Sequence, residues 1–164
     1  MAYTIQTPEA GFQPIAVTDT TQNHALGTQV TANDPTYGQG TFIYLKGIAN
    51  TVVGSLVDYD QTLGTTALAP ATGGIGPVAV AMSANVASQY GWYQVVGAAA
   101  VKAPNAAVVG AEVFMLAATP GSVDDAQVNG EQIVNAKFST TTGTPSSGLA
   151  VIQIAWPFHQ GQIV

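Results

Sequence analysis

The sequence contains few side chains with the reactivity that catalysis or metal binding requires. It has no cysteine, which excludes disulfides, thiolate catalysis and zinc sites built from cysteine. Its two histidines, His24 and His159, lie far apart in the chain, and neither has a second ligand at the spacing of a metal motif. We therefore expect both histidines to be exposed to solvent, and we predict no metal site and no cofactor.

The acidic residues and the glycine-rich stretches form no known motif either. Aspartates pair at residues 58–60 and 124–125, but an EF-hand calcium loop starting there needs glycine at its sixth position, where the sequence has Leu63 or Asn129. Aspartates that bond their own backbone in turns explain both pairs. No serine lies in a G-x-S-x-G motif, and residues 73–77 lack the lysine of a phosphate-binding loop. The sequence thus predicts a protein without enzymatic activity.

Aromatic residues gather in two places, at residues 90–93 and 156–158. Such side chains dominate protein cores and subunit interfaces, and exposed ones can stack on sugar rings. We expect packing in a core or an interface, and we keep sugar binding by Trp92 or Trp156 as an alternative.

The composition restricts the partners. Hydrophobic residues make up 47% of the chain and charged residues only 7%, so its surface is either uncharged and polar or covered by other chains. The net charge is −6, and the only lysines and arginines are three scattered lysines. Nucleic acids and anionic membranes require clustered basic residues, so we expect neither as a partner. The longest apolar stretch, residues 95–118, is too interrupted by polar residues to span a membrane.

The pattern of apolar residues predicts an extended arm followed by a β domain. Residues 1–25 show neither a helical stripe nor sustained alternation, so we interpret them as an N-terminal arm that orders against another surface. From residue 26 to residue 164, short runs rich in valine, isoleucine, threonine and aromatic residues alternate with turn residues. The predicted strands are residues 27–31, 41–46, 52–59, 77–82, 91–101, 113–116, 133–138 and 149–156. In residues 42–45 both faces of the strand are apolar, which predicts a strand covered on both sides. This pattern is typical of an all-β protein with a compact barrel or sandwich.

Several stretches carry a resemblance to a known family. They are residues 26–28 (LGT), 37–47 (YGQGTFIYLKG), 89–97 (QYGWYQVVG), 110–114 (GAEVF), 120–123 (PGSV), 148–150 (GLA) and 156–158 (WPF). In the pattern and order of these stretches, the chain resembles the capsid decoration proteins of tailed bacteriophages, which are also called cement or head-stabilising proteins.

The resemblance implies a compact β-barrel or β-tulip-like sandwich with an extended N-terminal arm. It also implies a structural virion protein, made in the host cytoplasm, that sits on the outer capsid surface and clamps subunits of the major capsid protein. The protein is expected to form homo-oligomers, with a trimer favoured. We expect the contacts to capsid or sister subunits to involve Ile5, Phe12, Pro14, Ile15, Trp92, Trp156 and Phe158. Other virion β-proteins, such as a head fibre base or a tail component, and a carbohydrate-binding module are the alternatives.

Overall fold

The computed structural model describes residues 4–5 and 12–161, and eleven strands lie within these residues. They are β1 (Thr4–Ile5), β2 (Gln29–Asp34), β3 (Gly38–Lys46), β4 (Leu56–Tyr59), β5 (Thr66–Leu68), β6 (Val78–Ala81), β7 (Tyr90–Lys102), β8 (Glu112–Met115), β9 (Val123–Asp124), β10 (Gln132–Phe138) and β11 (Leu149–His159). The same residues contain no helix, and thus none that is long and apolar enough to cross a membrane.

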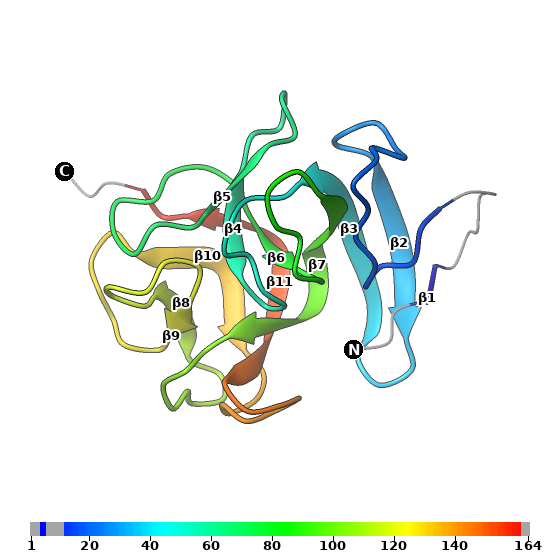
Figure 1. Ribbon diagram of the computed structural model, residues 1–164. Helices are drawn as coiled ribbons and strands as arrows, with labels where there is room; N and C mark the ends of the chain where they lie inside the picture. The colour runs from blue at the N-terminus through cyan, green and yellow to red at the C-terminus, as the bar shows by residue number, and fades with distance from the viewer. Residues whose placement is uncertain (1–3, 6–11, 162–164) are drawn as a thin grey trace.

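The strands form one antiparallel sheet that curls strongly into a half-barrel. Its main path runs β1-β2-β3-β7-β11-β10-β8-β9, and β6, β4 and β5 branch from β7. In Figure 1 the β2–β3 hairpin lies at one side of the molecule and β8, β9 and β10 at the other, with β7 and β11 between them. The prediction of an all-β, barrel-like fold is confirmed.

The long strand β7 holds the two halves together. Its first half pairs with β3 and β6, and its second half pairs with β11. One core cluster packs the barrel half and includes Leu56, Val80, Val101, Met115, Phe138 and Ile152. Ile43 and Leu45 of β3 belong to a second cluster, whereas Phe42 and Tyr44 belong to a third. Because alternate residues of a strand face opposite sides, β3 is covered on both faces, as its doubly apolar sequence predicts.

The predicted strand ranges all overlap observed strands, but some boundaries differ. The range 52–59 contains a strand only from Leu56, because residues 52–55 form a turn in which Ser55 N donates to Val52 O at 3.0 Å and Gly54 has φ 84°. Strands β1, β5 and β9 were not predicted. Each has only two or three residues, which is too short for an alternating pattern to be recognised.

Burial of a tyrosine on β7 makes the stability of the fold depend on pH in the alkaline range. Burial raises the pKa of Tyr93 to about 12 from its ordinary value of 10.0, and its hydroxyl accepts a hydrogen bond from Asn85 Nδ2 at 3.0 Å. The folded state therefore holds the phenol proton more tightly than the unfolded state does. The contribution of Tyr93 to stability is complete below pH 10 and is lost as the pH rises toward 12.

We expect the free energy of unfolding to fall by about 1–3 kcal/mol over this pH range through Tyr93. Urea denaturation at pH 8, 10 and 11 would measure the fall. A Tyr93→Phe variant lacks the ionisable group and should show a shallower alkaline slope. An unchanged slope in this variant would contradict the assignment.

Candidate functional site

Residues 12–25, which we call the N-terminal segment, pack against β3 and β7 of their own domain. Ile15 is 3% exposed within the cluster that contains Phe42, Tyr44 and Trp92. The indole Nε1 of Trp92 donates a hydrogen bond to Gln13 O at 3.1 Å. Further along the segment, the backbones of Asp19 and Tyr90 pair as a β-bridge, with hydrogen bonds of 2.8 and 3.0 Å. Hydrophobic burial and backbone hydrogen bonds therefore both fix this segment to the domain.

This placement changes the interpretation of the predicted arm. The change in composition near residue 26 suggested an arm ending there, but residues 12–25 form part of the domain surface. The physical reason is that Phe42, Tyr44 and Trp92 point to the face of the sheet that the segment covers. Most of the arm before residue 12 lies outside the described residues. The two described residues of this part, Thr4 and Ile5, form β1, whose backbone pairs with Asn33 and Ala32 of β2.

The predicted contact residues divide into two groups. Phe12, Ile15 and Trp92 pack within the chain, and the Phe12 and Trp92 rings lie 5.9 Å apart between centroids. Pro14 is exposed, as are Trp156 (46%) and Phe158 (44%) near the end of β11. The side chain of Ile5 lies outside the described ones.

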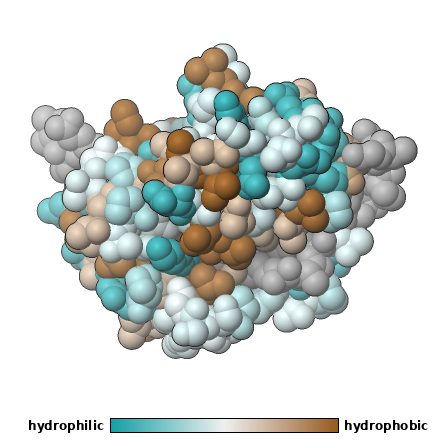
Figure 2. Space-filling model, in the orientation of Figure 1, coloured by the Kyte–Doolittle hydropathy of each residue, from teal (hydrophilic) through white to brown (hydrophobic). Residues whose placement is uncertain are grey.

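An apolar depression lies beside the N-terminal segment and has a volume of about 390 Å³. Its lining residues are Ala16, Val53, Ala81, Met82, Ala100, Pro145, Ser146 and Leu149. Val17, the next residue of the segment, is exposed. Figure 2 shows hydrophobic side chains gathered near the centre of the drawn face. The residues that line this depression come from segments distant in the sequence and form one hydrophobic surface. We call this surface, together with the exposed Val17, the N-terminal face.

The second histidine is buried, contrary to the expectation of an exposed side chain. His159 is 3% exposed, and its Nε2 lies 2.7 Å from Asp58 Oδ1, although 101 residues separate the two in the chain. Because an ionised carboxylate can only accept, Nε2 carries the shared hydrogen. Asp58 lies on β4 and not in a turn. His24 is also partly buried, and its ring centroid lies 5.6 Å from that of Trp92.

The loop between β5 and β6 closes over this histidine. A side chain at Gly74 would collide with the imidazole ring, so only glycine fits there without rearrangement. Glu131 accepts a hydrogen bond from Gly73 N at 2.9 Å, and His159 N donates to Gly76 O at 3.0 Å. The Asp58–His159 pair and the loop together fasten the end of β11 to β4.

An aspartate–histidine pair can activate a nucleophile only if a hydroxyl or thiol reaches the other imidazole nitrogen. Among the described residues, Nδ1 of His159 has no hydrogen-bond partner, and the imidazole is fully buried. The arrangement therefore suits a structural clamp.

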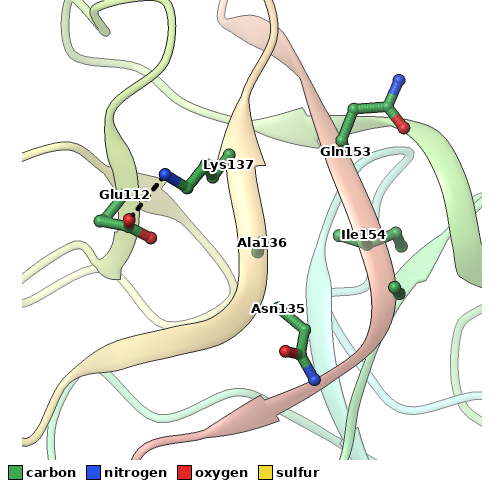
Figure 3. A pocket seen from close by; sticks show the side chains of 7 residues that line it. Glu112, Asn135, Ala136, Lys137, Gln153 and Ile154 are labelled. Carbon is green, nitrogen blue, oxygen red and sulfur yellow. Dashed lines mark ion pairs between the residues drawn. The ribbon is translucent and has the colours of Figure 1, made fainter.

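A second concavity, the β10–β11 groove, lies on the outer side of the barrel half and has a volume of about 490 Å³. Its lining residues are Glu112, Asn135, Ala136, Lys137, Gln153, Ile154 and Ala155. Figure 3 shows the Lys137 side chain directed at Glu112, with 3.0 Å between Nζ and Oε1. Asn135 and Gln153 add amide groups from the two neighbouring strands (Figure 3). The groove thus offers hydrogen-bond donors and acceptors without a net charge.

Within the described ranges, no three histidine, aspartate or glutamate side chains come together in a way that could hold a metal ion. Comparison of the chain with models of known protein families, with curated protein sequences and with solved structures found no match. The resemblance to capsid decoration proteins therefore rests on the pattern of residues alone.

Proposed function

We propose that this chain is a structural virion protein that binds the outer surface of a phage capsid and clamps subunits of the major capsid protein. The observation that carries the proposal is the N-terminal face. Ile15 anchors the segment to the domain, the exposed Ala16 lines an apolar depression, and Val17, the next residue in the chain, is exposed as well. A surface of this kind suits an apolar element of a partner, because burying it removes hydrophobic area from water.

The small share of charged residues in the protein supports the same function. A shell repeats each contact many times, so modest hydrophobic contacts suffice if the protein also associates with its own copies. An acidic chain with three lysines is poorly suited to the DNA-facing side of a shell and is tolerated outside it. The proposed oligomer is a homotrimer, which sedimentation of the purified protein would test by its mass.

Replacing Val17 by aspartate should weaken capsid binding by at least about tenfold, because the carboxylate would be desolvated in an apolar contact. The measurement is co-sedimentation with shells assembled from the major capsid protein of the same virus. Val128→Asp is the matched control, since Val128 has a similar exposure, 42% against 46% for Val17, and lies in another loop.

Two results would contradict the assignment. Val17→Asp binding as tightly as the parent would exclude the N-terminal face, and a density map that places the chain on a tail or a fibre would exclude the capsid role. Both variants should unfold within about 0.5 kcal/mol of the parent, because the replaced side chains are exposed.

A further inference from the structure

The β10–β11 groove is shaped by an irregularity in the pairing of its two strands. Ala136 pairs with Ile154 and Val134 with Phe158, so residues 155–157 of β11 stand opposite Asn135 alone. Asn135 and Trp156 both have left-handed backbone conformations, with φ 61° and 52°. Non-glycine residues adopt this conformation only at a cost, and such bulges commonly redirect a side chain.

The consequence is an exposed aromatic side chain, Trp156, beside the groove and next to Ala155 of its lining. In a regular strand, neighbouring side chains alternate between the two faces, yet Ala155 and Trp156 are both exposed. The bulge therefore turns Trp156 to the same outer side as Ala155, which lines the groove. Packing in the core does not account for a tryptophan at this position, because 46% of Trp156 is exposed.

The polar groups of the groove restrict the class of ligand. Glu112 and Lys137 neutralise each other, and the amides of Asn135 and Gln153 both donate and accept hydrogen bonds. A strongly anionic or cationic ligand would face a like charge in this pair. A purely apolar ligand would leave the amides unsatisfied. The groups match an uncharged ligand that has many hydroxyls and one apolar face.

We propose that the β10–β11 groove binds a neutral saccharide, whose apolar ring face stacks on the Trp156 indole while its hydroxyls bond to Asn135 and Gln153. Recognition by one aromatic platform and a few polar groups is the usual chemistry of such small-molecule sites. The other tryptophan cannot serve, because Trp92 is 0% exposed. The site is independent of the proposed capsid contact, since Trp156 lies seven positions along β11 from Leu149 of the apolar depression.

The full chain would be screened on an array of neutral oligosaccharides, and hits measured by calorimetry and by tryptophan fluorescence. We expect Trp156→Ala to weaken binding at least tenfold and Trp156→Phe to retain part of it. Asn135→Gly removes the amide but tolerates the left-handed backbone, and it should weaken binding several-fold. Leu63→Ala is the control, because this exposed side chain lies in the β4–β5 loop.

Three outcomes would overturn the proposal: no neutral saccharide binding to the parent, binding confined to charged glycans, or undiminished binding in Trp156→Ala. The fold of each variant is checked by its unfolding curve, and Trp156→Phe distinguishes loss of stacking from loss of structure. Val17→Asp should leave saccharide binding unchanged. A failed capsid assay and a failed saccharide assay therefore have separate meanings.

Discussion

Replacing Trp92 by alanine is expected to lower the free energy of unfolding by about 3–5 kcal/mol, the range for large aromatic side chains removed from a core. Trp92 is fully buried, and its ring lies 5.1 Å from that of Tyr44 and 5.6 Å from that of His24. The substitution also removes the hydrogen bond to Gln13 O. The N-terminal segment would thus lose both packing and a polar anchor.

Urea denaturation measures this loss, and limited proteolysis shows where it acts. Cleavage should increase within residues 12–25 before the rest of the chain is attacked, because the segment depends on Trp92 for its attachment. The matched control is Trp156→Ala, which removes the same side chain from a position where 46% of it is exposed and should therefore cost clearly less than Trp92→Ala. Equal losses in the two variants would refute the placement of the N-terminal segment.

Replacing His159 by alanine should destabilise the protein by about 3 kcal/mol. The substitution leaves Asp58 without its partner and opens a cavity beneath Gly74. We place the loss at the low end of the range for broken buried pairs, because a quarter of the Asp58 side chain (25%) is exposed and water can solvate it.

A double-mutant cycle with Asp58→Ala separates the pair from the packing of the imidazole. We expect the sum of the stability losses of the two single variants to exceed the loss of the double variant. Gln160→Ala is the control, since this neighbouring side chain is exposed. Strict additivity of the two substitutions would show that the Asp58–His159 contact contributes nothing to stability.

Strand β3 and the two histidines show where sequence reasoning succeeded and where it failed. The run from Phe42 to Leu45 predicted a strand covered on both faces, and the structure places its alternate residues in different core clusters. By contrast, the two terminal histidines were expected to be exposed. Their burial depends on Trp92, Asp58 and the loop at Gly74, all distant in the chain.

The candidate sites follow the same division. The sequence singled out Trp92 and Trp156 equally as aromatic contacts, and only the structure distinguishes a core side chain from an exposed one. It gave no signal for the β10–β11 groove. Asn135 and Gln153 are ordinary strand residues until a bulge sets three residues of β11 opposite one of β10.

The sequence by itself determined the all-β class, the positions of the longer strands and the scarcity of charge and reactive groups. These are local properties, since the alternation of side chains and the residues that favour turns act over a few neighbours. Only the tertiary structure decided the attachment of residues 12–25, the pairing of Asp58 with His159 and the exposure of Trp156. Each depends on which strands become neighbours and in what register, and this is set by packing over the whole chain.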